Sequence, residues 1–114
     1  MANPLVVDAN PLCAALLGGR ARDIVWSEEF ELHATQHTLF EVAKYIPKLA
    51  KRINYDELRL FHEYQVMPVR AHQPADYDNH IESAETLIRQ RDPDDVPLLA
   101  LALALGYSIW TNDD

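Results

Sequence analysis

The chain has 114 residues, which is enough for one compact domain and too few for two. Apolar residues make up 48% of it, so a core can form, yet no apolar run reaches the roughly 20 residues that span a bilayer. The formal charge of −8 argues against a simple phosphate-binding protein, whose surface is usually basic, unless bound cations or grouped basic residues offset the acids.

The start of the chain and its cysteine content bear on location. The first residues, Met-Ala-Asn-Pro-Leu, lack the basic segment that opens a secretory signal. The one cysteine, Cys13, lies in an apolar stretch and is expected to be a small buried side chain without a disulfide partner. Both features fit a reducing compartment. We therefore expect a cytoplasmic protein with no membrane segment.

Strand-like and helix-like segments alternate along the chain. An apolar strand, Leu5-Val-Val, precedes an apolar helix that the glycine pair at Gly18 ends. Residues 39–51 carry apolar side chains at a helical period, and Pro47 is expected to kink or break that helix. In chain order we expect a strand at 5–7, helices at 12–17 and 22–26, a strand at 30–34, helices at 39–51 and 55–64, a strand at 66–69, helices at 77–89 and 96–105, and a strand at 107–110.

This alternation indicates the fold class. Strands separated by helices form a parallel sheet with helices on both faces. We therefore expect a single α/β domain over residues 1–114, with a three-layer α/β/α arrangement. Sheets of this kind bind their ligands beyond the carboxyl ends of the strands.

Four acidic residues fall at that edge of the expected sheet. Asp8 follows the first strand and Asp113 follows the last. Asp95 opens the final helix. At ~1.5 Å per helical residue and ~3.3 Å per strand residue, the helix and the strand after it each cover roughly 16 Å, so Asp95 and Asp113 return to one edge. Glu41 lies about a turn inside its helix, and its long side chain leans toward the helix N-terminus.

Such a group of carboxylates requires compensation. At ~4 Å and an effective dielectric of ~20, each like-charged pair costs on the order of 4 kcal/mol. Oxygen ligands without a Cys/His set suit Mg²⁺ or Mn²⁺, and these ions can activate a water and stabilise the leaving oxygen of a phosphodiester. We therefore predict that Asp8, Asp95 and Asp113 bind a metal ion and that Glu41 binds it or orients the attacking water.

Each candidate also has a purely structural interpretation. Asp8 could satisfy a turn, and Glu41 could be a solvated helix residue. Asp95 could stabilise a helix start that Asp94 caps, and Asp113 could belong to a polar chain end. The five histidines show no ligand spacing and are expected to be scattered. A group of basic residues could either form a solvated face or contact an RNA backbone. These residues are Lys44, Lys48, Lys51, Arg52, Arg89 and Arg91.

Together, the motifs resemble the PIN-domain family, specifically its bacterial toxin-like members. The matching segments are Leu5-Val-Val-Asp-Ala-Asn10, Thr38-Leu-Phe-Glu-Val-Ala43, Arg91-Asp-Pro-Asp-Asp-Val-Pro-Leu-Leu-Ala-Leu-Ala102 and Ile109-Trp-Thr-Asn-Asp113. The resemblance implies a three-layer α/β/α fold and cleavage of single-stranded RNA with Mg²⁺ or Mn²⁺. By motif, the acidic ligands are Asp8, Glu41, Asp95 and Asp113, and the supporting polar residues are Asn10, Thr111 and Asn112.

The resemblance has further implications. Many members are toxins held by a cognate antitoxin, and many are homodimers. Members usually continue beyond the Thr-Asn-Asp motif into a helix and an edge strand, whereas this chain ends at Asp114. We therefore expect a truncated sheet edge, which leaves the activity of this chain open.

Two other functions remain as alternatives. The first is a non-catalytic, PIN-like interaction module, which the acidic charge favours. The second is a phosphoacceptor receiver or a phosphohydrolase on a similar sheet. Receivers usually show paired acids after the first strand and phosphohydrolases an Asp-x-Asp, and the segment Asp8-Ala-Asn10 offers neither.

Overall fold

The computed structural model describes residues 2–88 and 95–111. Four parallel strands form one sheet in the order β3-β2-β1-β4. The strands are β1 (Asn3–Val7), β2 (Phe30–Thr35), β3 (Val69–His72) and β4 (Ser108–Trp110). The helices are α1 (Ala9–Leu17), α2 (Gly19–Trp26), α3 (Gln36–Arg52), α4 (Glu57–Val66), α5 (Ile81–Ile88) and α6 (Val96–Leu105), with short 3₁₀ turns η1 (Pro74–Asp76) and η2 (Asp78–His80).

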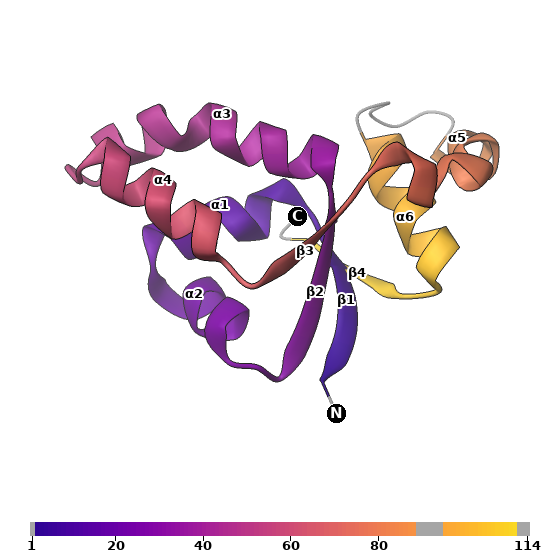
Figure 1. Cartoon of the computed structure of the whole chain (residues 1–114), viewed down its shortest axis with the longest axis horizontal. Coiled ribbons are helices and arrows are strands. Elements are labelled where there is room, and N and C mark those ends of the chain that lie inside the picture. Colours follow the sequence, from indigo (N-terminus) through magenta and orange to yellow (C-terminus); the bar gives the residue numbers. More distant parts are fainter. Residues whose placement is uncertain (1, 89–94, 112–114) are drawn as a thin grey trace.

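Helices cover both faces of the sheet, which confirms the predicted three-layer α/β/α fold. Figure 1 shows α1, α2, α3 and α4 on one side of the strands and α5 and α6 on the other. The side chains of β1 alternate between the two layers, as the period of a strand requires. Val7 packs into the core beneath α1–α4, and its neighbour Val6 packs beneath α5 and α6. Each layer thus has its own hydrophobic core.

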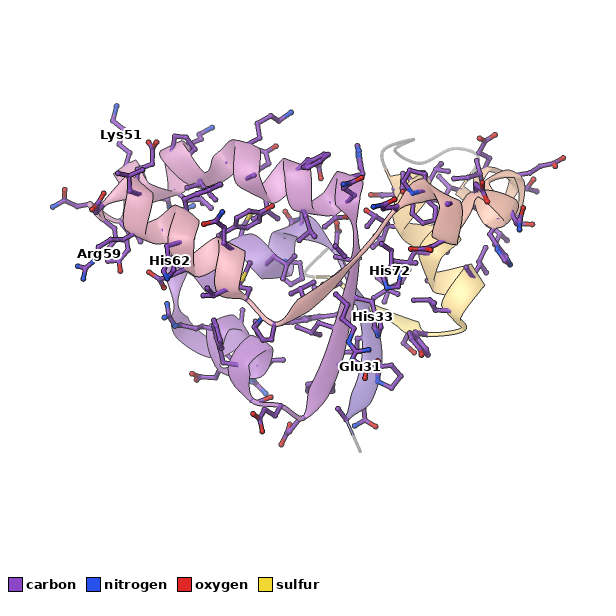
Figure 2. The ribbon with its side chains drawn as sticks, in the orientation of Figure 1. Glu31, His33, Lys51, Arg59, His62 and His72 are labelled. Atoms are coloured by element: carbon purple, nitrogen blue, oxygen red, sulfur yellow. The ribbon has the colours of Figure 1, made fainter. Side chains whose placement is uncertain are left out.

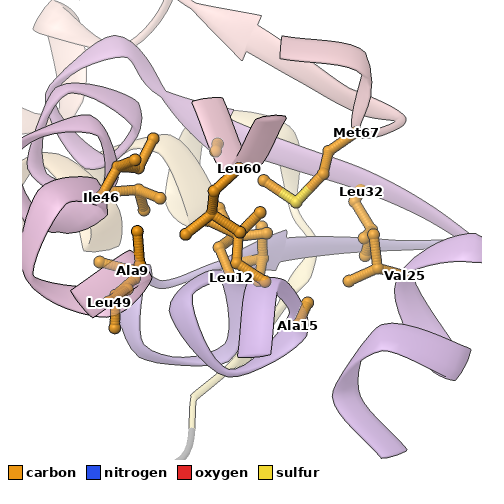
Figure 3. Close-up of a cluster of buried hydrophobic side chains, with 14 residues drawn as sticks. Ala9, Leu12, Ala15, Val25, Leu32, Ile46, Leu49, Leu60 and Met67 are labelled. Carbon is orange, nitrogen blue, oxygen red and sulfur yellow. The ribbon is translucent and has the colours of Figure 1, made fainter. Parts of the chain in front are cut away.

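The larger core joins the sheet to four helices (Figure 3). Leu12 of α1, Ile46 of α3 and Leu60 of α4 are almost completely buried there, and Leu32 contributes from β2. Burying a side chain of this size contributes roughly 1.5–3 kcal/mol. This packing holds α1 and α3 in place, and each of these helices begins at the carboxyl end of a strand.

Two predicted elements need correction. The predicted strand at 66–69 is wrong, because α4 continues to Val66 and β3 begins only at Val69. The residue before a proline is pushed into extended backbone, so Met67, which precedes Pro68, ends the helix and the strand follows. The predicted helix at 77–89 begins only at Ile81, after the two 3₁₀ turns, and its last residue lies outside the described residues.

Pro47 does not break α3, so of the two predicted effects, a kink or a break, the break does not occur. The helix runs without interruption from Gln36 to Arg52 although a proline inside a helix costs roughly 3 kcal/mol. Pro47 is exposed, while Ile46 before it and Leu49 two positions after it are buried in the core. Packing of this face offsets the lost backbone hydrogen bond.

The most apolar helix is short. The ten residues of α6 bury Leu98, Ala100, Leu101 and Ala102 against the sheet and α5. Gly106 ends the helix with a positive φ of 72°, which a residue without a Cβ adopts at little cost. Within residues 2–88 and 95–111, no helix has the length and apolar character to cross a membrane.

Candidate active site

Asp8 lies at the carboxyl end of β1, beside the end of β4. Val7 is in register with Trp110, and the Asp8 backbone N–H donates to the Trp110 carbonyl at 3.0 Å. One carboxylate oxygen of Asp8 accepts from the Ala9 N–H at 2.7 Å and so caps α1. The other oxygen accepts from the Thr111 hydroxyl at 3.3 Å. The side chain is half-buried, and its direction is fixed by groups from both ends of the chain.

Asp95 shares a hollow with Asp8. The hollow has a volume of about 210 Å³, and its lining consists of Asp8, Ile88, Asp95, Leu98, Leu99, Ile109 and Thr111. Asp95 precedes α6 and is half-buried, but its side chain makes no capping hydrogen bond to that helix. Helix capping therefore does not account for Asp95. Two carboxylates and a hydroxyl line this hollow among apolar walls. The predicted return of Asp95 and Asp113 to one edge concerns a residue, Asp113, that lies outside the described residues.

Glu41 approaches from the other layer of helices. Buried Thr35 ends β2 and caps α3, because its hydroxyl oxygen accepts from the Thr38 N–H at 2.9 Å. Its own hydroxyl donates to Thr38 Oγ1 at 3.0 Å. The second turn of α3, which carries Glu41, is thus anchored near the carboxyl end of β2. Glu41 is half-buried and does not line the hollow that contains Asp8 and Asp95.

The negative charges of Glu41 and Asp8 both act on the thiol of Cys13. Burial raises the pKa of its thiol from 9.0 to about 11, with further contributions from the negative charges of Glu41 and then of Asp8. The thiol on α1 therefore lies within electrostatic range of both acids. A thiol with so high a pKa stays protonated at neutral pH, so Cys13 is not an activated nucleophile.

The other predicted site residues are placed as follows. Asn10 is exposed in the first turn of α1, and Lys44 and Lys48 are exposed on α3. Among residues 2–88 and 95–111, no three His, Cys, Asp or Glu side chains are grouped closely enough to hold a metal ion. The candidates that lie outside the described residues are Asp113, Asn112, Arg89 and Arg91. The structure thus brings Asp8, Asp95 and Thr111 together and places Glu41 apart from their hollow.

A comparison with protein families identifies the fold family. The sequence matches the PIN domain over residues 6–114, a range that includes all four predicted acids. The chain belongs to the PIN-domain family. PIN domains are in general nucleases that use divalent metal ions. No curated protein sequence matches the chain.

A larger hollow of this PIN domain lies at the opposite edge. It has a volume of about 520 Å³ and is found at the amino ends of β2 and β3. Its lining includes Trp26, Phe30 and Met67 and none of the four predicted acids. Parallel sheets bind their ligands beyond the carboxyl ends of the strands. This location and the presence of two predicted acids make the smaller hollow at Asp8 the candidate site.

A chain of polar contacts that the sequence did not predict joins β2 to the edge strand β3. His33, which is 5% exposed, has its Nδ1 atom 2.9 Å from His72 Nε2 and its Nε2 atom 2.8 Å from Glu31. His72 Nδ1 lies 3.3 Å from Asp76. Figure 2 shows Glu31, His33 and His72 side by side where β2 meets β3. The prediction that the histidines are scattered is therefore wrong for this pair.

These contacts constrain the protons on the two rings. When Glu31 is ionised its carboxylate only accepts, so the N–H of His33 Nε2 donates to it, and His33 Nδ1 can then accept from the N–H of His72 Nε2. The only sequence signal was the spacing of two residues in Glu31 and His33 and again in Arg70 and His72, which puts each pair on one face of its strand.

Proposed function

We propose that this PIN domain is a metal-dependent endoribonuclease that cleaves single-stranded RNA. The observation that carries the proposal is the shared hollow of Asp8 and Asp95, two acids far apart in the sequence that meet beyond the carboxyl end of β1. Membership of a family of nucleases supports the reaction class. The RNA substrate and the choice of ion rest on the motif resemblance and on donor chemistry.

The donor set of the hollow suits a hard divalent cation. Asp8, Asp95 and the Thr111 hydroxyl offer only oxygen atoms. Two like charges facing one hollow favour a bound cation, and oxygen donors favour Mg²⁺ or Mn²⁺. We assign Asp8 and Asp95 as its ligands, and by motif Asp113 as a third and Glu41 as a ligand or as the group that orients water. When bound, such an ion supplies an activated water and stabilises developing negative charge.

The remaining residues of the hollow prepare these ligands. The Ala9 N–H and the Thr111 hydroxyl each bind one oxygen of Asp8 and hold its carboxylate in a single orientation. The side chains of Leu98, Leu99 and Ile109 form an apolar wall, which lowers the local dielectric and strengthens the attraction between a cation and the carboxylates. The protonated thiol of Cys13 does not compete as a nucleophile.

A finer proposal concerns the biological role. We propose that the domain is the toxin of a toxin–antitoxin pair, that it forms a homodimer and that it works in the cytoplasm. The resemblance of the four motifs to toxin-like PIN domains supports this role.

The test compares cleavage of an unstructured, end-labelled RNA in Mn²⁺ by the parent and by Asp8→Asn. Asparagine caps helices as well as aspartate does, so this variant keeps the hydrogen bond to Ala9 while it loses the charge. We expect cleavage to fall at least about 100-fold, or ~2.7 kcal/mol in the barrier. Asp23→Asn, a change in an exposed residue of α2, serves as the matched control and should cleave like the parent. Equal cleavage by Asp8→Asn and the parent would remove the role assigned to Asp8.

A second candidate is a non-catalytic PIN-like interaction module. The formal charge of −8 favours it, because proteins that bind phosphates usually have a basic surface. Calorimetric titration with Mn²⁺ separates the two functions. A nuclease should release heat on binding that Asp8→Asn and Asp95→Asn abolish, whereas a module without a metal site should show no heat that depends on either residue.

A further inference from the structure

One face of α3 carries an exposed row of cations that begins beside Glu41. At ~100° per residue, Phe40, Lys44, Lys48 and Lys51 fall within an arc of about 80° around the helix. We call these four residues the α3 stripe. All four are exposed, and Phe40 is 64% exposed, while Val42, Ile46 and Leu49 on the opposite side of the helix are buried. Figure 2 shows Lys51 pointing away from the molecule at the far end of α3.

The charge of this segment is opposite to that of the rest of the chain. Residues 42–55 contain four cations and no acid, so the other 100 residues carry a formal −12 within a total of −8. No salt bridge to Lys44, Lys48 or Lys51 occurs within residues 2–88 and 95–111, although acids are abundant elsewhere. Like charges one turn apart also weaken a helix slightly. The helix dipole favours Lys51 in the last turn of α3, but it does not account for Lys44 and Lys48. The row suits an anionic ligand.

We propose that single-stranded RNA lies along the α3 stripe, with its phosphates on Lys44, Lys48 and Lys51 and a base stacked on Phe40. The choice of RNA as the ligand rests on the proposed function. The stripe itself indicates where the strand binds and how many nucleotides it contacts. From Phe40 to Lys51 the helix rises about 16 Å. A stacked strand covers that distance in roughly five nucleotides at ~3.4 Å each. Exposed aromatic rings next to a basic track are typical of single-strand binding.

The position of Phe40 links the stripe to the candidate active site. Phe40 precedes Glu41 and lies at the end of the stripe nearest the carboxyl end of β2. A base stacked on Phe40 would place the adjoining phosphodiester beside the acidic edge, and the lysines would hold the strand that leads away from it. An acidic peptide could also bind the three lysines. Binding of such a peptide would not explain why an exposed aromatic ring lies at the end of the stripe next to Glu41.

The first test measures RNA binding at several salt concentrations, with Ca²⁺ replacing Mn²⁺ and a fluorescent, unstructured 12-nucleotide RNA as the probe. The slope of log K against log salt for single strands is about −0.7 per phosphate neutralised, so Lys44→Gln/Lys48→Gln/Lys51→Gln should make the slope shallower by about 2. The control Arg20→Gln/Arg59→Gln/Arg70→Gln removes the same charge from exposed positions off the stripe and should leave the slope unchanged. Equal slopes for the lysine triple and the parent, or no RNA binding by the parent, would overturn the proposal.

The second test addresses Phe40 and strand length. Phe40→Ala should weaken binding about 5- to 100-fold, which corresponds to the loss of one base–aromatic stacking contact. Phe40→Trp should retain binding, because it keeps an aromatic ring at this position. Affinity should rise with RNA length to roughly five nucleotides and then level off. No effect of Phe40→Ala, or a polyglutamate peptide that binds the stripe more tightly than RNA, would contradict the assignment to RNA.

These experiments distinguish a failure of the proposed RNA binding by the α3 stripe from a failure of the proposed nuclease activity. Stripe-dependent binding without cleavage in Mn²⁺ would retain the RNA track and remove the proposed function. Cleavage in Mn²⁺ with an unchanged salt slope and KM in the lysine triple would retain the nuclease and place its substrate elsewhere.

Discussion

Cys13 provides a test of the site geometry that does not depend on catalysis. With a pKa of about 11 the folded thiol is about 0.1% ionised at pH 8, whereas a thiol with the ordinary pKa of 9.0 is about 10% ionised. The folded protein should therefore contain about 100-fold less thiolate. Since a more basic thiolate is a better nucleophile, with a Brønsted slope of ~0.4–0.5, alkylation should be slowed by about 10- to 15-fold relative to the unfolded chain.

The assay is the rate of iodoacetamide alkylation between pH 7 and 11, with the unfolded protein in urea as the reference. Glu41→Gln should lower the Cys13 pKa and speed the reaction, and Asp8→Asn should do so less, because the Glu41 charge is the larger of the two. Glu57→Gln, an exposed change on α4, is the matched control. If Glu41→Gln and Asp8→Asn left the pH profile unchanged, the two carboxylates would not converge on α1, and the reasoning for a shared site would be wrong.

The raised pKa also makes stability depend on pH. The unfolded thiol ionises near pH 9.0 and the folded one near 11, so this contribution to stability is complete below 9 and is lost as the pH rises through 11. Two pKa units correspond to ~2.7 kcal/mol, which screening at a half-buried group reduces to about 1 kcal/mol. The stability difference between the parent and Cys13→Ala, measured by urea unfolding, should change by that amount between pH 8 and 11.

Two further predictions concern contacts made by single side chains. Thr111→Val removes the hydroxyl that donates to Asp8, and a hydrogen bond to a charged group contributes ~1.5 kcal/mol, so kcat/KM for RNA cleavage should fall about 10-fold while Thr111→Ser stays near the parent. His72→Ala leaves the buried Nδ1 atom of His33 without its partner and should lower the free energy of unfolding by ~1–3 kcal/mol in urea titrations, whereas the exposed His62→Ala should change it little. Equal effects of the two histidine changes would show that the contact across β2 and β3 carries no stability.

The sequence by itself determined the class of fold and the edge at which to look for a site. Strand and helix periods indicated a parallel sheet between two helical layers, and the chain has that sheet. The lengths of α6 and the strand after it predicted that Asp95 lies at the edge where the last strand ends, and Asp95 lines a hollow there with Asp8 and Thr111. Both inferences rest on local geometry, because the rise per residue and the direction of side chains follow from the backbone alone.

Only the tertiary structure decided which of the predicted groups meet. Glu41 belongs to α3 in one helical layer and Asp95 opens α6 in the other, so the sheet separates their helices. Of the predicted acids among residues 2–88 and 95–111, Asp8 is the one that directly follows the central strand β1, between the two layers. The pairing of His33 with His72 depends on the register of β2 against β3, and a shift of one residue would turn each side chain to the other face. Register and layer are set by packing between distant segments, and no local period in the sequence records them.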